Sequence, residues 1–305
     1  MTDTATQTDR LTLRIGHSPD PDDAFMWYPL ANFTAPDGSV LRPKIDTGPY
    51  DFVHVLEDIQ SLNERSDRAE LEITALSIHQ YPHVAANYAL TSCGASLGDG
   101  YGPMVIAPQE KKLTLDALPS ARLAIPGTRT SAWLALQLLL HEQGGRADDL
   151  DWQVVPFDQI IPKVTAGEFD AGLIIHEGQL TYADAGLDCV IDLGKWWTDT
   201  RGLPLPLGGN AIRRDLGEHL PRICDVLLRS IQWALAHREE SVRFALNYAR
   251  DMGSDLADEF VGMYVNQWTL DYGERGRAAV RRFLDEAKAA QLVPDFGEVD
   301  FVEPG

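Results

Sequence analysis

Residues 169–178 read FDAGLIIHEG, a short apolar run that ends in a histidine. A run of this length after a glycine-containing turn is typical of a buried strand over residues 171–175. Ligands of open α/β sheets bind at the edge where such strands end, and His176 emerges at that edge. Because imidazole titrates near neutral pH, His176 is a candidate general base. The alternative is a histidine that is only hydrogen-bonded at the end of the strand.

Strand and helix signals alternate on both sides of this stretch. Apolar runs predict strands near residues 11–16, 43–47, 71–75, 104–107, 121–125, 152–155 and 189–193. Helical spacing predicts helices over residues 22–30, 52–62, 130–141 and 159–165, and a nearly all-helical segment over 216–290. Such alternation is typical of βαβ units, so we predict an α/β fold with parallel sheets.

Glycine and proline concentrate in two segments, residues 93–103 and 203–209. We interpret these segments as two crossings of the chain between lobes. The prediction is a larger α/β lobe from residues 11–103 and 208–305, and a smaller α/β lobe from residues 104–207. Two-lobed proteins of this type bind small ligands in the cleft between the lobes.

The chain has 305 residues, of which 44% are hydrophobic, and a formal net charge of −20. That charge repels polyphosphate backbones and anionic lipid surfaces, so we expect neither a nucleic acid nor a membrane as partner. No apolar stretch is long enough to cross a bilayer and the first ten residues are polar, so we expect a cytoplasmic location. Cys93, Cys189 and Cys224 are widely spaced, which predicts free buried thiols and no zinc site.

Three strand-to-helix junctions carry hydroxyl side chains. HSPDPDDAFM at residues 17–26 follows the first strand, and its prolines and aspartates either only cap a helix or also place Ser18 at the cleft. PGTRTSAW at residues 126–133 opens a helix, where free amides with Thr130 and Ser131 form either an anion site or a cap. ALSIHQYP at residues 75–82 places Ser77 at a third junction. His17 is a further candidate to face the cleft.

The glycine-rich segment 94–102 does not fit a phosphate-binding loop. It contains no Gly-x-Gly-x-x-Gly pattern that opens a helix and no Gly-Lys-Ser/Thr. The sequence also lacks a set of ligands with metal-binding spacing. We therefore predict no nucleotide, cofactor or metal, and expect a small carboxylated ligand held by local donors.

Three motifs carry a resemblance to a known family: IGHSPDPDDAF at residues 15–25, PGTRTSA at residues 126–132 and DAGLIIHEG at residues 170–178. They resemble the 1,4-dihydroxy-6-naphthoate synthase family of the futalosine route to menaquinone. The resemblance runs from about residue 11 to the last helices, and the His-Glu-Gly element is its most specific part. It implies a two-lobed fold of the periplasmic-binding-protein type. Where the family more usually carries Cys, Asn and Thr, this chain has Asp20, Asp22 and Ala24.

The resemblance also implies a reaction. Family members are lyases that split cyclic dehypoxanthinyl futalosine into 1,4-dihydroxy-6-naphthoate and dihydroxyacetone. By similarity, His176 is the proton acceptor. Ser77 then contacts the ligand from the first lobe, and Thr130 with Ser131 contacts it from the second. Removal of a proton permits a retro-aldol-like cleavage driven by formation of an aromatic ring, so the resemblance implies no cofactor.

Two other functions stay open at this stage. A non-catalytic solute-binding protein can share the fold, since fold does not fix function. The missing signal peptide and lipobox cysteine count against it. A chorismate dehydratase-like enzyme shares the two-lobed fold as well, but the element His176-Glu177-Gly178 favours the naphthoate synthase. The sequence leaves the oligomeric state open.

Overall fold

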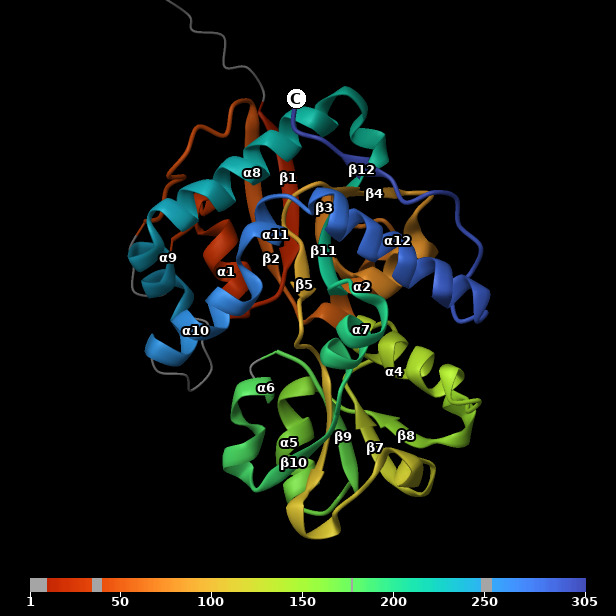
Figure 1. The fold of residues 1–305 in the computed structure, drawn as a ribbon. Coiled ribbons are helices and arrows are strands. Elements are labelled where there is room, and N and C mark those ends of the chain that lie inside the picture. The colour runs from red at the N-terminus through yellow and green to blue at the C-terminus, as the bar shows by residue number, and fades with distance from the viewer. Residues whose placement is uncertain (1–9, 35–39, 177, 248–253) are drawn as a thin grey trace, which may run out of the picture.

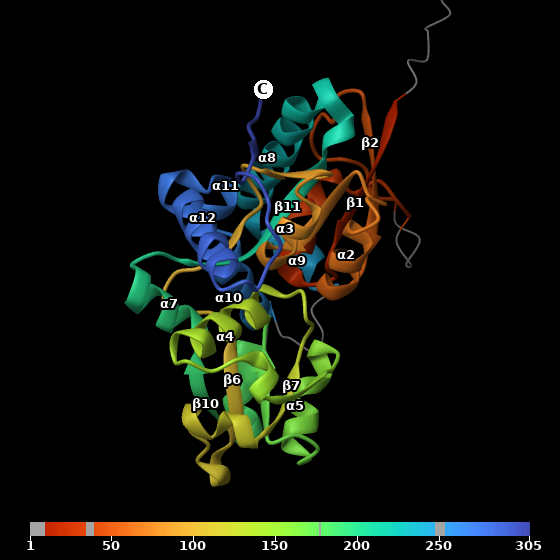
Figure 2. The same cartoon turned by 90° about the vertical axis from the view of Figure 1, so that its right-hand side faces the viewer.

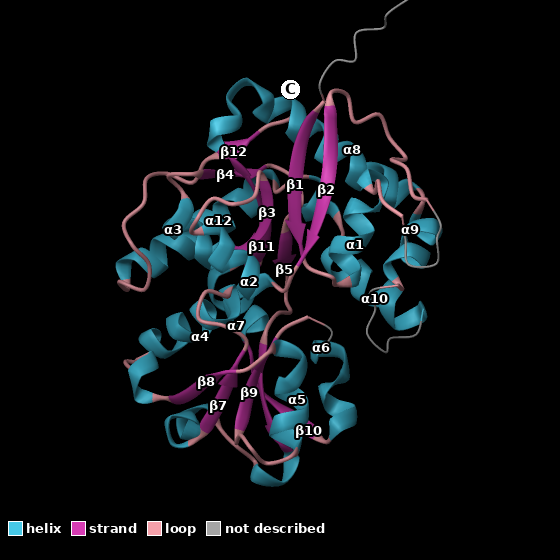
Figure 3. Ribbon diagram, turned by 180° about the vertical axis from the view of Figure 1, so that it is seen from behind, coloured by secondary structure: helices cyan, strands magenta, loops and turns pink. Residues whose placement is uncertain are grey.

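The computed structural model describes residues 10–34, 40–176, 178–247 and 254–305. Its chain forms two lobes, each with one sheet and surrounding helices (Figures 1 and 3). The larger sheet contains β1 (Leu11–His17), β2 (Tyr50–Leu56), β3 (Ile73–Ser77), β4 (Tyr88–Thr91), β5 (Ser96–Gly98), β11 (Leu205–Arg213) and β12 (Phe301–Val302). The smaller sheet contains β6 (Met104–Pro108), β7 (Arg122–Ile125), β8 (Asp151–Val154), β9 (Ala171–Ile174) and β10 (Leu187–Asp192).

The described helices surround these sheets. They are α1 (Pro21–Trp27), α2 (Ile59–Ser66), α3 (Tyr81–Val84), α4 (Ser131–Glu142), α5 (Phe157–Thr165), α6 (Gly178–Thr181), α7 (Leu193–Arg201), α8 (Leu220–Ala236), α9 (Arg238–Ala245), α10 (Ser254–Tyr264), α11 (Gln267–Leu270) and α12 (Gly273–Ala289). In the smaller lobe, α4 and α5 lie on opposite sides of the sheet (Figures 1 and 2). In the larger lobe, α8, α9 and α10 pack against α1. None of the helices in the described residues is long and apolar enough to span a bilayer.

Both sheets are mixed. The larger sheet has the order β12-β4-β11-β3-β1-β2, with β5 beside β11, and the smaller has the order β10-β6-β9-β7-β8. The predicted parallel pairing holds for β1 with β2 and β3, and for β7 with β8 and β9. It is wrong for β6, β10 and β11, which run antiparallel to their neighbours. Two of these strands, β6 and β11, begin just after the chain has crossed from one lobe to the other.

One helix and one strand were predicted wrongly in the first hundred residues. The chain forms strand β2 over residues 50–56, where helical spacing predicted a helix, and α2 starts only at Ile59. The described residues 43–47 form no strand. Val53 and Leu56 are 47% and 41% exposed, because β2 lies at the edge of the sheet. Their apolar side chains completed a helical pattern without belonging to a helix.

Glycines permit the close approach of the two crossings between the lobes. A Cβ on Gly194 would lie 1.9 Å from the carbonyl oxygen of Tyr101, and one on Gly102 would lie 2.8 Å from Gly194 Cα. The strands change sheet between residues 98 and 104 and again between residues 192 and 205. The lobe boundaries at 103/104 and 207/208 stay a prediction.

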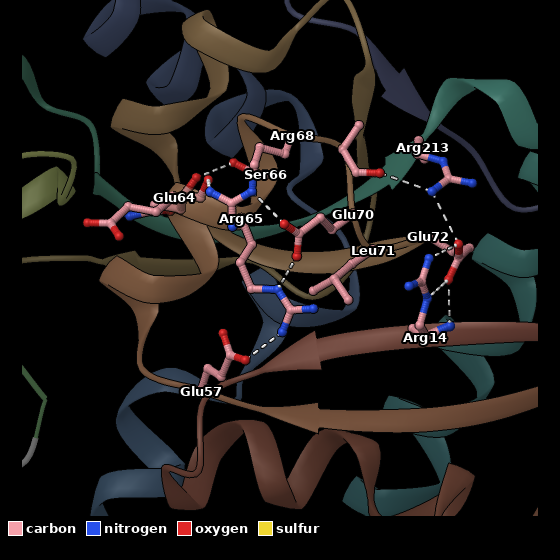
Figure 4. Close-up of polar contacts among 12 residues, drawn as sticks. Arg14, Glu57, Glu64, Arg65, Ser66, Arg68, Glu70, Leu71, Glu72 and Arg213 are labelled. Carbon is pink, nitrogen blue, oxygen red and sulfur yellow. Dashed lines mark hydrogen bonds and ion pairs between the residues drawn. The ribbon is translucent and has the colours of Figure 1, made fainter.

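A charged cluster fixes three neighbouring strands of the larger sheet (Figure 4). Glu72 Oε2 accepts hydrogen bonds from Arg14 N at 2.9 Å and from Arg14 Nε at 2.8 Å, and Arg213 Nη1 lies 3.2 Å from Glu72 Oε1. Burial raises the pKa of Glu72, but Arg14 and Arg213 together hold it below its ordinary value. The cluster ties the residue just before β3 to β1 and β11.

The cysteines are free, and two of the three are buried. Cys93 and Cys224 lie in the larger lobe with little exposure, as predicted. The prediction of a buried thiol is wrong for Cys189, which is exposed. Cys189 lies on β10, the edge strand of the smaller sheet, where one side of the strand has no neighbouring strand to cover it.

Candidate active site

A cleft of about 810 Å³, its open mouth included, lies between the two lobes. All five of the predicted site residues line it: Ser18, Ser77, Thr130, Ser131 and His176. Ser18 and Ser77 come from the ends of β1 and β3, and the other three come from the smaller lobe. Ends of strands and starts of helices from both lobes therefore meet at the cleft, as in other α/β proteins that bind ligands between lobes.

His176 follows β9, whose four residues are all buried in the middle of the smaller sheet. Its backbone has a φ of 54°, which is uncommon for a residue other than glycine, and 20% of its side chain is exposed. The ring packs edge-on against Phe157 at 4.8 Å between centroids. Nδ1 lies 3.4 Å from Asp20 Oδ2, while the buried Nε2 has no hydrogen-bond partner among the described residues.

The loop after β1 forms a compact hydrogen-bonded turn. Ser18 Oγ donates to Asp20 Oδ2 at 2.6 Å, and Asp20 N donates back to Ser18 Oγ at 3.0 Å. Ser18 N donates to Asp23 Oδ2 at 2.8 Å. Asp20 occupies the N-cap position of α1, but its side chain makes no capping hydrogen bond. The capping interpretation is therefore wrong for Asp20, whose carboxylate is directed to Ser18 and His176.

Two further carboxyls of this loop line the cleft, and burial changes their protonation. Burial raises the pKa of Asp23 to about 7, although the hydrogen bond from Ser18 N opposes the shift. Burial, followed by the charges of Asp23 and Asp20, raises the pKa of Asp22 well above its ordinary value. Asp22 Oδ1 is buried with no partner among the described residues. A protonated Asp22 is able to donate a hydrogen bond to a ligand oxygen at neutral pH.

The hydroxyls at the start of α4 are already used within the protein. Thr130 Oγ1 donates to Gly127 O at 2.8 Å and accepts from Trp133 N at 3.2 Å, so it caps the helix. Ser131 Oγ donates to Leu207 O at 2.5 Å and accepts from His79 N at 3.2 Å. A ligand at this helix start therefore meets backbone amides and the positive end of the helix dipole more readily than free hydroxyl protons.

Ser77 offers a hydroxyl proton to the cleft. Asn63 Nδ2 donates to Ser77 Oγ at 3.1 Å, and Ser77 N donates to Asn63 Oδ1 at 2.9 Å. The hydroxyl thus accepts a hydrogen bond, and its own proton has no acceptor among the described residues. This geometry suits a donor to a ligand oxygen.

Sequence reasoning missed three side chains that line the cleft. Gln179 Nε2 donates to Tyr264 OH at 2.5 Å, and Asn210 Nδ2 donates to Gly94 O at 2.9 Å. The amide oxygen of each side chain, Gln179 Oε1 and Asn210 Oδ1, is buried without a partner in the described part of the chain. No local motif marks these residues, because Tyr264 belongs to the C-terminal helices and Asn210 lies inside a strand.

Two other polar residues of this region do not add a catalytic group. His17 is buried, donates from Nδ1 to Ser18 O, and has its Nε2 2.9 Å from His54 Nδ1. The prediction that it faces the cleft is wrong, because it is not among the residues that line the cleft. The letters around Ser96 match Gly-x-Ser-x-Gly, but Ser96 lies in β5 and pairs with Gly208, whereas a nucleophile elbow joins a strand to a helix. Within the described ranges, no three His, Cys, Asp or Glu side chains are grouped closely enough to hold a metal ion.

Solved structures share this architecture. A crystal structure of a protein from Archaeoglobus fulgidus is 41% identical and covers 92% of this chain and 98% of that one, with a TM-score of 0.81. A ligand-binding component of an ABC-type import system from Staphylococcus aureus has a TM-score of 0.68 at 12% identity, covering 97% of each chain. The alkanesulfonate-binding protein SsuA from Xanthomonas axonopodis also has a TM-score of 0.68, at 13% identity, covering 94% and 96%. The predicted fold of the periplasmic-binding-protein type is confirmed.

Sequence relatives identify the family. Two proteins named 1,4-dihydroxy-6-naphthoate synthase match over almost their whole length. One, from Thermus thermophilus, is 40% identical over 92% of this chain and 95% of its own. The other, from Streptomyces coelicolor, is 36% identical over 94% and 96%. A family model described as menaquinone biosynthesis matches residues 13–289. The chain therefore belongs to the menaquinone biosynthesis family, together with these two relatives.

Proposed function

We propose that the chain splits cyclic dehypoxanthinyl futalosine into 1,4-dihydroxy-6-naphthoate and dihydroxyacetone, with His176 as the proton acceptor. It is a lyase of menaquinone biosynthesis with the activity that its relatives are named for. The observation that carries the assignment of the base is the position of His176. Its ring lines a cleft between two lobes, and its Nε2 has no hydrogen-bond partner among the described residues. We also propose a cytoplasmic location for this enzyme.

In this proposal the residues of the cleft divide the work between binding and proton transfer. His176 removes a proton from the substrate, the carbon–carbon bond to the three-carbon fragment breaks, and its electron pair completes the aromatic ring. The imidazolium then returns its proton to the products, which restores the base. The amides at the start of α4 receive a ligand carboxylate, supported by the positive end of the helix dipole. Ser77 donates its free hydroxyl proton to a ligand oxygen. Ser18 and the hydroxyls of Thr130 and Ser131 hold the walls of the site in place.

The test incubates the purified protein with cyclic dehypoxanthinyl futalosine and follows formation of the dihydroxynaphthoate by absorbance and chromatography. His176→Asn should lower kcat by about 100- to 10,000-fold, the usual contribution of a general base, with little change in KM. His141→Asn is the matched control, since His141 is exposed on α4 outside the cleft, and it should keep normal turnover.

Other outcomes would overturn the proposal. Tight binding of the substrate with no product from the wild-type protein would favour a solute-binding protein. Dehydration of chorismate without turnover of the futalosine would favour a chorismate dehydratase-like enzyme. Normal turnover in His176→Asn would show that the protein is the proposed lyase but that another group removes the proton.

A further inference from the structure

A carboxylate of the larger lobe meets the imidazole of the smaller lobe across the cleft. Asp20 lies at the start of α1 and is 3% exposed, and its Oδ2 lies 3.4 Å from His176 Nδ1. The same Oδ2 accepts the hydroxyl proton of Ser18 at 2.6 Å. Asp20 N in turn donates to Ser18 Oγ, so the hydroxyl that holds the carboxylate is itself fixed by the backbone.

This contact determines which ring nitrogen of His176 can act as a base. An ionised carboxylate only accepts hydrogen bonds, so the ring nitrogen that faces it is favoured as N–H. In a neutral imidazole the other nitrogen then carries the free lone pair. That nitrogen is Nε2, the one without a partner among the described residues.

Resting on the proposed function, we propose that Asp20 is a positioning residue that holds His176 as its Nδ1–H tautomer and leaves Nε2 as the base. The carboxylate also stabilises the imidazolium that forms when Nε2 takes the proton, as an aspartate does behind the histidine of a catalytic triad. Asp20 itself does not touch the substrate in this role.

A second contact holds the same turn against the larger lobe. Gln179 N donates to His176 O at 3.2 Å, and the side chain of Gln179 donates to Tyr264 OH at 2.5 Å. Here α6 lies opposite α10 across the junction of the lobes (Figures 1 and 3). On the side of α4 the junction adds an apolar core to its hydrogen bonds: one buried cluster contains Ile78 of the larger lobe together with Leu134 of the smaller, and His79 N donates to Ser131 Oγ at 3.2 Å.

The two sides of the junction therefore differ in what holds them. The side of α4 has a continuous apolar core beside its hydrogen bonds, whereas His176 and Gln179 contact the larger lobe through polar side chains that separate if the lobes part there. The orientation of His176 by Asp20 consequently depends on contact between the lobes. The pair of Asp20 and His176 therefore exists only while the two lobes are in contact on this side.

The experiment uses the full-length protein and three variants. Asp20→Ala removes the acceptor, and Asp20→Asn keeps an amide oxygen of nearly the same shape without the charge. Asp46→Asn is the matched control for loss of one negative charge, because Asp46 is exposed in a turn and does not line the cleft. Steady-state kinetics give kcat and KM, and ¹⁵N–¹H correlation NMR of histidine-labelled protein reports which ring nitrogen carries the proton. The His176→Asn spectrum identifies the His176 signals.

We expect Asp20→Ala to lower kcat by about 10- to 100-fold with KM changed less than about threefold, because an orienting carboxylate acts on the base and not on ground-state binding. Its His176 signals should show loss of the pure Nδ1–H form. Asp20→Asn should recover part of kcat together with the Nδ1–H form, and Asp46→Asn should match the wild type.

The inference fails if both Asp20 variants keep wild-type kcat, or if His176 is an Nε2–H tautomer in the wild-type protein. If Asp20→Ala does not fold, Asp20→Asn alone decides, through its kcat and its tautomer. Failure of the proposed function gives a different result, because the wild-type protein then forms no dihydroxynaphthoate while the tautomer of His176 is still measurable.

Discussion

Replacement of Thr130 by alanine should destabilise the protein while leaving ligand affinity nearly unchanged. Thr130 is 2% exposed, and its hydroxyl both caps α4 and donates to the buried carbonyl of Gly127. Loss of an N-cap costs about 1 kcal/mol. Gly127 O keeps the longer hydrogen bond from the backbone N of residue 130 at 3.4 Å, so loss of the hydroxyl donor costs about another 0.5–1 kcal/mol. Loss of the buried methyl group adds roughly 0.8 kcal/mol. The free energy of unfolding should therefore fall by about 2–3 kcal/mol.

Thr130→Ser separates these contributions, since it keeps both hydrogen bonds and loses only the methyl group. Its free energy of unfolding should fall by roughly 0.8 kcal/mol. Calorimetric melting should give a Tm about 3–5 °C below the wild type for Thr130→Ala, and a drop of only about 1 °C for Thr130→Ser.

Affinity for the product tests whether the hydroxyl of Thr130 also binds the ligand. Isothermal titration with 1,4-dihydroxy-6-naphthoate should give dissociation constants within about threefold of the wild type for both variants, because the amides of α4 remain in place. A hydroxyl that donates to the ligand would cost about 1.5 kcal/mol, or roughly tenfold in affinity. A tenfold loss of affinity in Thr130→Ala with an unchanged Tm would refute the reasoning.

Three further predictions concern packing, charge and metal dependence. Gly172→Ala should lower the free energy of unfolding by about 1–3 kcal/mol, because its Cβ would lie 2.4 Å from Ile160 Cγ2, whereas Gly297→Ala has open space and should change little by chemical denaturation. Glu72→Gln should destabilise the protein by about 1–3 kcal/mol at pH 7. Arg14 and Arg213 lower the pKa of Glu72 in the folded protein. The stabilisation is therefore present above pH 4.5, the ordinary value, and is lost as the pH falls through the lowered pKa, so the denaturation curves of the wild type and Glu72→Gln should converge in acid. Turnover should survive dialysis against a strong chelator; loss of activity that a divalent ion restores would contradict this.

Local sequence was sufficient to predict a strand where the segment is buried on all sides. Strand β9 has four buried residues between two neighbouring strands, so its apolar run has no competing explanation. The helix start at Thr130 was also predictable, because the cap and the glycine turn lie within a few residues of each other. Residues 52–56 were predicted wrongly, since an edge strand can expose apolar side chains and thereby break its own alternation.

The sequence by itself determined the two-lobed α/β class, the strand that ends near His176 and the hydroxyls at three strand-to-helix junctions. These features depend on periodicity and capping over a few residues, so they are visible without the rest of the chain. Only the tertiary structure decided that Asp20 faces His176, and that Gln179 meets Tyr264, 85 residues away. It also decided that the hydroxyl of Ser131 is already used inside the protein, and it selected the cap over the anion site for the hydroxyl of Thr130. The pairs Asp20–His176, Gln179–Tyr264 and Ser131–Leu207 each join segments far apart in the sequence, and such partners leave no periodic pattern along the chain.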